Sequence, residues 1–515
     1  MDWACGQACT LNPKSANQGA ESVKGDVTDR DKQLSRGSLY VAVGQGVFLL
    51  TSFVLYAILA RLLEPGPYGL FRVAMTVLIW VEIAVNNGVP SALQKFLPDA
   101  SLSEPGVRRA AARVQALVGG GVFLAFFLAA PLLASLLRDP ELTGYLRLAS
   151  LDMAGMSAYA YYRGFLNGKR AFRQLASAIA AYGLTKLLVS SLLVYAGWGV
   201  NGALLGNVAS SLGGLAVAFL WSRRWPRESS GEAGRIVNER EILAFVLPAV
   251  GFTLASNLLL QIDLMGVQRL VSDDVQVGYY SAAVILADAP RLILLAFSFT
   301  LLPSLSHAIA AGDLSQTRSY LHQVIRLLAL AIVPMVALVT ATAGSLVAFI
   351  FGGAYRSGGP FLAVLIVSYG AYSIYITLVT ALLAENRPRQ ALAIPLALLP
   401  VAVVAIWLGV TWLGPIGAAW ASLLCVGGAA LIVVVYVLRR YRPAVDLGSL
   451  GRIVLASAVV GGAAWLWSPS GLWLPIGYLL LGGLYLALLL ALRELRLQDL
   501  TQVVIWLARP KVGPR

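Results

Sequence analysis

Residues 415–438 read PIGAAWASLLCVGGAALIVVVYVL, an apolar stretch that contains no charged side chain. A helix of about twenty apolar residues is long enough to cross a hydrocarbon layer about 30 Å thick. Stretches of this kind recur about fourteen times between Leu39 and Leu492. Most of the chain is therefore predicted to lie within a membrane.

The composition indicates one integral membrane body. Of the 515 residues, 58% are hydrophobic and 12% are charged, whereas charged residues make up about 25% of an average soluble domain. The first 37 residues are polar and contain no apolar core of the kind found in signal peptides. We expect these residues to form a disordered cytoplasmic tail.

Short landmarks of the first half of the sequence return in the second half. Tyr68-Gly69-Leu70-Phe71 returns as Val277-Gly278-Tyr279-Tyr280, Val89-Pro90-Ser91 as Leu302-Pro303-Ser304, and Gly199-Val200-Asn201-Gly202-Ala203 as Gly414-Pro415-Ile416-Gly417-Ala418. Lobes built on an internal repeat are typical of membrane transporters. We therefore predict an all-α polytopic membrane protein with two six-helix, pseudo-repeated lobes and two C-terminal helices.

The expected organisation has about fourteen transmembrane helices. They are predicted at residues 39–60, 68–90, 110–137, 142–165, 172–196, 200–221, 242–267, 277–302, 324–351, 361–384, 391–413, 415–438, 453–467 and 472–492. The predicted units are a disordered tail (1–37), an N-lobe with spans 1–6 (38–221), a cytoplasmic linker (222–241), a C-lobe with spans 7–12 (242–438), spans 13 and 14 (453–492) and a cytoplasmic amphipathic tail (493–515).

The net charge of +14 suggests nucleic-acid binding at first sight, but the distribution of Lys and Arg argues against it. If the N-terminal tail is cytoplasmic and the helices alternate in direction, about 31 of the 39 basic residues lie on the inner side, as the positive-inside rule requires. Both termini are therefore predicted to be cytoplasmic, and no nucleic-acid partner is predicted.

The sequence lacks the residue patterns of an enzyme. It has only two histidines, His307 and His322, and no His-Glu-x-x-His or Cys-x-x-Cys motif. Its three cysteines do not suggest a disulfide framework. No connection on the outer side is long enough to hold catalytic groups as a membrane ligase would. We predict a transporter without a metal site or a cofactor.

Seven ionisable residues fall inside predicted spans. They are Arg72 and Glu82 in span two, Asp152 in span four, Lys186 in span five, Asp263 in span seven, and Asp288 and Arg291 in span eight. A charge at the centre of a membrane helix costs about 2.5–3.5 kcal/mol on translocon-insertion scales, so each of these groups is expected to face protein or a water-filled cavity. Together they predict a polar interior.

The cations Lys186, Arg291 and Arg72 are the candidates for binding an anionic substrate. Lys186 is the strongest, because it lies deepest in its span and has no acidic residue three or four positions away. Arg72 lies near the outer end of its helix and has the alternative of snorkelling to the headgroups. Asp288 and Arg291 are three residues apart, so a structural ion pair is the alternative to a transport role.

The buried carboxylates are the candidates for coupling transport to an ion. They are Glu82, Asp152, Asp263 and Asp288. The sequence leaves open whether H⁺ or Na⁺ is the coupling ion, or whether these groups are structural.

Several motifs resemble a known family. The runs ARLLEPGPYGLF (60–71) and NGVPSALQKFLP (87–98), followed by Tyr162-Arg163-Gly164 and Gly199-x-x-Gly202-Ala203, resemble the Wzx-type polysaccharide flippases. The resemblance implies the fold of the multidrug/oligosaccharidyl-lipid/polysaccharide exporter superfamily, with two lobes around a central cavity. It also implies location in a bacterial or archaeal inner membrane.

Relatives of this kind move a polyprenyl-diphosphate-linked oligosaccharide from the inner to the outer leaflet for cell-surface polysaccharide biosynthesis, by alternating access. The resemblance thus implies a lipid-linked saccharide and the bilayer as partners. Two alternatives share the fold, a lipid II flippase of peptidoglycan synthesis and a multidrug cation antiporter. The first span lacks a dense set of arginines, which disfavours the former, and the helices after residue 438 disfavour the latter. A membrane glycosyltransferase or ligase is the least favoured alternative.

Overall fold

The computed structural model describes residues 13–99, 101–224, 235, 237–271, 273–291, 305, 308–309, 312–385, 387–443 and 446–494 of the chain. Within these residues the regular structure is helical, and the only β-type pairing is an isolated bridge between Leu102 and Arg235. The predicted all-α fold is confirmed.

The N-lobe contains the first eight α-helices and one π-helical turn. These are α1 (Pro13–Leu63), α2 (Pro65–Asn87), α3 (Val89–Phe96), α4 (Glu104–Leu137), α5 (Leu142–Ser150), α6 (Asp152–Gly168), α7 (Phe172–Leu193), η1 (Val194–Trp198) and α8 (Gly199–Ser222). The predicted second span breaks at Gly88, and the helix restarts as α3 with a proline in its first turn. The predicted fourth span is likewise divided into α5 and α6 at Leu151.

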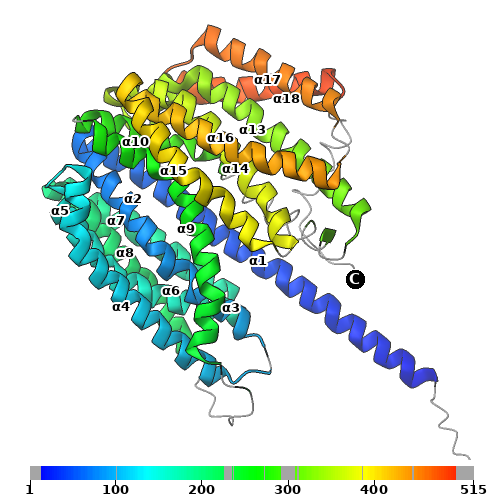
Figure 1. Ribbon diagram of the computed structural model, residues 1–515. Coiled ribbons are helices and arrows are strands. Elements are labelled where there is room, and N and C mark those ends of the chain that lie inside the picture. Colours follow the sequence, from blue (N-terminus) through cyan, green and yellow to red (C-terminus); the bar gives the residue numbers. More distant parts are fainter. Residues whose placement is uncertain are drawn as a thin grey trace, which may run out of the picture.

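The C-lobe and the C-terminal pair contain the remaining helices of the described residues. These are α9 (Glu239–Leu270), α10 (Asp274–Ala287), α13 (Leu314–Phe351), the 3₁₀-helix η2 (Gly353–Gly358), α14 (Gly359–Ala384), α15 (Pro388–Leu413), α16 (Pro415–Tyr441), α17 (Leu447–Trp467) and α18 (Trp473–Ala491). Pro334, Pro395 and Pro400 lie inside α13 and α15, which continue through them. Two successive bundles and a terminal pair follow one another along the chain (Figure 1).

Eleven helices of the described residues are long and apolar enough to cross a membrane. One of them, Phe172–Ser222, combines α7 and α8, which meet at the kink of Gly197. The α5–α6 pair and α10 occupy the positions of the predicted fourth and eighth spans without being counted among the eleven. The chain is a multi-pass membrane protein, and the expected number of fourteen spans is approximate.

The helix α1 begins much earlier than expected. Its backbone is helical from Pro13 onward, although the sequence predicts a disordered tail up to residue 37. The segment contains several good helix formers and continues directly into a membrane span, so it needs no nucleation step of its own. The N-terminal end of α1 projects away from the bundle in Figure 1. The predicted C-terminal amphipathic tail lies mostly outside the described residues.

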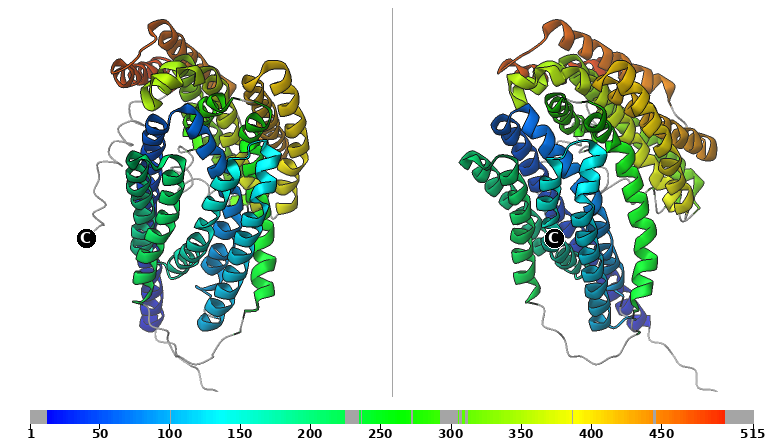
Figure 2. Two further views of the ribbon diagram at one scale, coloured as in Figure 1. Left: turned by 90° about the vertical axis from the view of Figure 1, so that its left-hand side faces the viewer. Right: turned by 60° about the vertical axis from the view of Figure 1, so that its left-hand side comes forward.

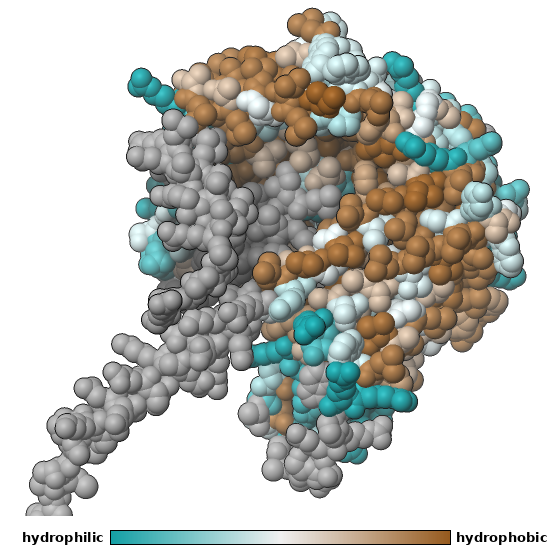
Figure 3. All heavy atoms as spheres, turned by 180° about the vertical axis from the view of Figure 1, so that it is seen from behind, coloured by the Kyte–Doolittle hydropathy of each residue, from teal (hydrophilic) through white to brown (hydrophobic). Residues whose placement is uncertain are grey.

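Two helix bundles lie side by side, and α17 and α18 cover one flank of the second bundle (Figures 1 and 2). The helix α17 packs against α13, while α9 contacts α15 and α16 of its own lobe and α2 and α4 of the N-lobe. Apolar side chains cover much of the surface seen in Figure 3. Large apolar side chains exposed on the molecule include Trp412 and Leu472, which are 79% and 85% exposed. Such a surface suits contact with lipid.

The two lobes meet where α2 crosses α10. A Cβ added at Gly278 would lie only 1.9 Å from the carbonyl oxygen of Pro65, so only glycine fits there. Nearby, Arg61 at the end of α1 donates from Nε to the carbonyl of Ile350 (3.0 Å) and from Nη2 to that of Phe349 (2.7 Å). These carbonyls belong to the last turn of α13, where a cation is favourable.

Candidate functional site

The structure gathers four of the seven predicted residues in the interior of the N-lobe. Arg72 and Glu82 come from α2, Asp152 from α6 and Lys186 from α7. Their exposed fractions are 6%, 9%, 0% and 6%, respectively. These four side chains are buried, so they face protein rather than lipid, as the sequence predicts. We call these four residues the N-lobe charge cluster.

Lys186 is a buried cation without a close counter-ion. Among the residues that the structure describes, none accepts a hydrogen bond from its ammonium group or pairs with it within 4.0 Å. Tyr56, Glu82 and Asp152 lie within electrostatic range of it. An ammonium group in this position retains most of its capacity to bind an anion.

Arg72 stacks against an aromatic ring. The central carbon of its guanidinium lies 4.7 Å from the centroid of the Tyr56 ring, which is a cation–π contact. Its Nε is buried and has no acceptor within the described part of the chain. The side chain is thus held inside the lobe, and the snorkelling alternative does not describe this geometry.

Glu82 and Asp152 lie within electrostatic range of each other in the interior of the lobe. Asn207 of α8 donates from Nδ2 to Asp152 Oδ2 at 3.0 Å, and Asn86 donates from Nδ2 to Glu82 Oε2 at 3.3 Å. Asp152 Oδ1 receives no hydrogen bond from a donor in the described residues.

Arg163, which was not among the site residues predicted from the sequence, lies on α6 beside the cluster. Its Nη2 donates to the backbone carbonyl of Asn86 at 3.1 Å. It lines a cavity of about 130 Å³ together with Gln45, Phe48, Glu82, Asn86, Met156, Tyr159, Ile179 and Tyr182. The missed signal was spacing, because Asp152 and Arg163 are about three helical turns apart and share one face of α6.

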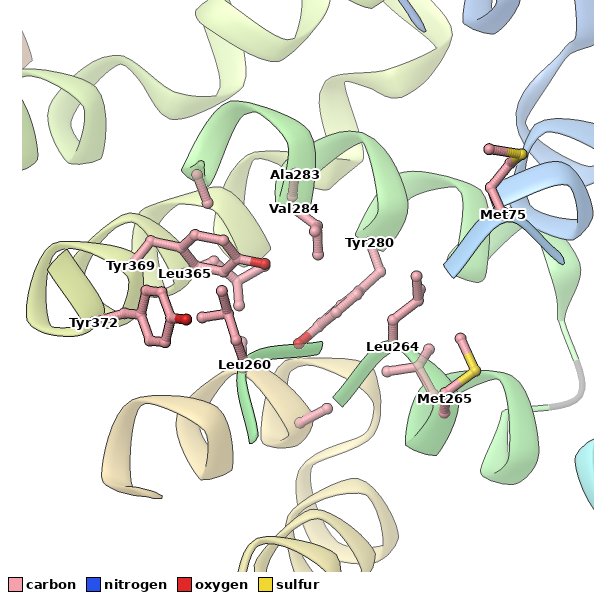
Figure 4. Close-up of a cluster of buried hydrophobic side chains, with 14 of the residues drawn as sticks. Met75, Leu260, Leu264, Met265, Tyr280, Ala283, Val284, Leu365, Tyr369 and Tyr372 are labelled. Carbon is pink, nitrogen blue, oxygen red and sulfur yellow. The ribbon is translucent and has the colours of Figure 1, made fainter. Parts of the chain in front are cut away.

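Asp263 lies apart from the N-lobe charge cluster, in the core of the C-lobe. Its Oδ2 accepts a hydrogen bond from the Tyr280 hydroxyl at 2.7 Å, and its Oδ1 accepts one from the backbone N–H of Leu264 at 2.8 Å. Figure 4 shows Tyr280 extending from α10 among Leu260 and Leu264 of α9. Both carboxylate oxygens thus have donors, which is sufficient to explain a buried structural aspartate.

Asp288 and Arg291 form a bidentate ion pair. Arg291 Nε lies 2.8 Å from Asp288 Oδ1, and Nη2 lies 2.7 Å from Oδ2. Their side chains are 30% and 47% exposed. The ion-pair alternative inferred from their spacing therefore describes their geometry, and Arg291 differs from Lys186 in already having an anionic partner.

No group of three or more His, Cys, Asp or Glu side chains in the described parts of the chain is arranged to hold a metal ion. His307 lies outside the described residues, and His322 lies in α13.

Solved structures of transporters share the fold. The lipid II flippase MurJ in an inward closed conformation has a TM-score of 0.71 and 13% identity over 88% of this chain and 99% of its own. An inward-facing multidrug resistance transporter of the MATE family has a TM-score of 0.63 and 14% identity over 78% and 98%. A transporter of the MOP superfamily from Pyrococcus furiosus has a TM-score of 0.57 and 15% identity over 80% and 96%.

No curated protein matches the chain. A family model described as polysaccharide biosynthesis protein matches residues 58–358, which is more than half of the chain. The predicted relationship to a polysaccharide biosynthesis family is thereby confirmed. With its helical transporter fold and this match, the chain belongs to the polysaccharide biosynthesis protein family.

Proposed function

We propose that the protein is a flippase that moves a polyprenyl-diphosphate-linked oligosaccharide from the inner to the outer leaflet for cell-surface polysaccharide biosynthesis. The observation that carries this proposal is the set of cations in the N-lobe interior, in which Lys186 is buried and lacks a close counter-ion. A diphosphate cannot cross hydrocarbon unaided, because desolvating its charge is too costly. Fixed ammonium and guanidinium groups compensate for that charge.

The contacts between the lobes support alternating access as the mechanism. Arg61 reaches from α1 to the last turn of α13, and the Tyr355 hydroxyl donates to the carbonyl of Ala60 at 2.9 Å. These contacts join the lobes at the end where α1 terminates, which the charge distribution predicts to be the outer end. Separation of the lobes at this end, with closure at the other, would expose the substrate to the outer leaflet.

The direct test is a leaflet-specific assay with the purified full chain in proteoliposomes. A fluorescent polyprenyl-diphosphate oligosaccharide is added to the inner leaflet, and its appearance in the outer leaflet is measured by quenching with an impermeant reagent. We expect protein-dependent transfer. The same assay with lipid II tests the alternative suggested by the fold of MurJ, and transfer of lipid II alone would contradict the proposal.

A further inference from the structure

A cavity of about 240 Å³ lies where the C-lobe meets the C-terminal pair of helices. Its walls come from α13, α14 and α16 of the C-lobe and from α17. Every side chain that lines it is Ala, Val, Leu or Ile. An apolar cavity of this size offers water no hydrogen-bond partners, so it favours an apolar occupant.

The cavity extends from the molecular surface into the protein. Among its lining residues, Leu438 is exposed, whereas Leu328, Leu378 and Val437 are almost fully buried. The lining residues of α14, α16 and α17 lie toward the helix ends that the charge distribution predicts to be cytoplasmic. An occupant therefore enters from the inner leaflet of the bilayer.

Two arginines meet at one buried carboxylate at this end of the helices. Arg326 of α13 donates from Nε to Glu494 Oε1 at 2.9 Å and from Nη2 to the backbone carbonyl of Glu494 at 2.7 Å. Arg452 of α17 donates from Nη1 to Glu494 Oε2 at 3.1 Å. Both arginine side chains are partly exposed, whereas the carboxylate is almost fully buried. The group therefore carries a net positive charge, and its cations are accessible from outside.

These arginines adjoin the cavity. Ile325, which lines the cavity, directly precedes Arg326. Leu450, which also lines it, lies two residues before Arg452. A guanidinium group has five N–H donors, and the contacts with Glu494 use two donors of Arg326 and one of Arg452. The remaining donors suit a phosphate group, which arginine binds through paired hydrogen bonds.

We propose that the cavity binds an acyl chain of an anionic phospholipid from the inner leaflet, and that the phosphate of this lipid binds to Arg326 and Arg452. An anionic headgroup is preferred, because the cation of a zwitterionic headgroup is repelled by the two arginines. The bound lipid contacts α13 and α17 together and so strengthens the attachment of the C-terminal pair to the C-lobe. The site is separate from the N-lobe charge cluster and does not depend on which molecule is transported.

Binding is tested by native mass spectrometry of the delipidated full chain in detergent, titrated with phosphatidylglycerol or with phosphatidylcholine of the same acyl chains. We expect wild type to retain one phosphatidylglycerol more tightly than phosphatidylcholine. Ala329→Phe fills the cavity and should abolish this retention. Arg326→Gln and Arg452→Gln should each weaken phosphatidylglycerol binding about tenfold or more and leave phosphatidylcholine binding unchanged. Arg109→Gln, at an exposed arginine of the N-lobe, is the control and should bind as wild type.

Glu494→Gln distinguishes lipid binding from a purely structural role of the arginines. The variant removes the negative charge that competes with the phosphate, but it keeps a side-chain oxygen that can accept the hydrogen bond from Ser449. We expect a higher affinity for phosphatidylglycerol than in wild type. A gain in affinity cannot result from misfolding. Lower thermal stability without a gain in affinity would show that the arginines serve only the network with Glu494, and would contradict the proposal.

Other outcomes would also overturn the proposal. Equal retention of the two phospholipids by wild type would exclude the headgroup site, and unchanged retention of phosphatidylglycerol by Ala329→Phe would exclude the cavity. Displacement of phosphatidylglycerol by a lower concentration of polyprenyl diphosphate would assign the cavity to the transported lipid instead. The leaflet-specific assay tests the proposed function separately, so failure of either proposal leaves the other open to its own test.

Discussion

Gly69 and Gly278 hold equivalent positions in the two halves of the sequence, and they pack against each other where α2 crosses α10. A Cβ added at Gly69 would lie 2.8 Å from the backbone nitrogen of Gly278 and 2.9 Å from the carbonyl oxygen of Asp274. The repeated Gly therefore allows two backbones from different lobes to approach closely. This crossing is one of the contacts between the lobes at the predicted outer end.

Replacing Gly278 with alanine should weaken this contact. The new methyl group would collide with the carbonyl oxygen of Pro65, and overpacking of this kind costs about 1–3 kcal/mol. We expect a lower melting temperature of the purified protein in detergent. Gly462→Ala is the matched control, since no atom lies within 4 Å of a Cβ added there. Equal melting temperatures of the two variants would contradict the close approach.

A disulfide between Gly66→Cys and Asp274→Cys should lock the lobes together. An ideal Cβ at position 66 would lie 3.9 Å from the Cβ of Asp274, and disulfides have Cβ–Cβ distances of about 3.5–4.5 Å. Under oxidising conditions we expect transport to stop, and reduction should restore it. Each single-cysteine variant is a control. Transport at the normal rate with the disulfide fully formed would refute alternating access.

Lys186→Ala should impair flipping more than Arg72→Ala. Lys186 has no close counter-ion in the described structure, whereas Arg72 is held by Tyr56. Loss of a hydrogen bond to a charged group removes about 1.5–3 kcal/mol, so the transport rate should fall about ten- to hundredfold. Rates are compared at matched protein levels. Lys169→Ala is the control, because Lys169 is paired with Glu104. Normal transport by Lys186→Ala would exclude it as the substrate site.

The orientation of the chain can be determined by cysteine labelling. After replacement of the native cysteines, a cysteine at Ser357 in η2 should react with an impermeant thiol reagent in intact cells. A cysteine at Ser229, in the predicted cytoplasmic linker, should react only after permeabilisation, because both termini and the linker are predicted to lie inside. Labelling of position 229 in intact cells would show that the topology is the reverse of the predicted one.

Glu385, at the end of α14, should make stability depend on acidic pH. Burial alone would raise the pKa of this carboxyl, but hydrogen bonds from Tyr436 (2.7 Å), Tyr441 (2.6 Å) and Arg440 (3.2 Å) more than offset burial and lower it. A lowered folded-state pKa stabilises the protein above the ordinary pKa of Glu, about 4.3, and this contribution is lost as the pH falls through the folded-state value.

The check is a melting-temperature profile from pH 7 down to the acid limit of solubility. Glu385→Gln should melt below wild type at neutral pH, and the difference should shrink on acidification. A difference that stays constant over the whole profile would show that Glu385 does not carry this pH dependence.

The sequence by itself determined the membrane-spanning helices, because length and apolarity of a segment decide locally whether it can cross a bilayer. The repeated landmarks also indicated that Gly69 and Gly278 are equivalent. The spacing of Asp288 and Arg291 indicated their ion pair, since residues three apart on one helix are neighbours in any fold. The tertiary structure alone decided which distant charges meet. Lys186, Asp152 and Glu82 lie on three helices, and their proximity depends on how those helices pack within the lobe. The same packing brought Arg163 beside Glu82 and enclosed Asp263 with Tyr280, because contacts between helices far apart in sequence are set by complementary side-chain surfaces rather than by any local pattern.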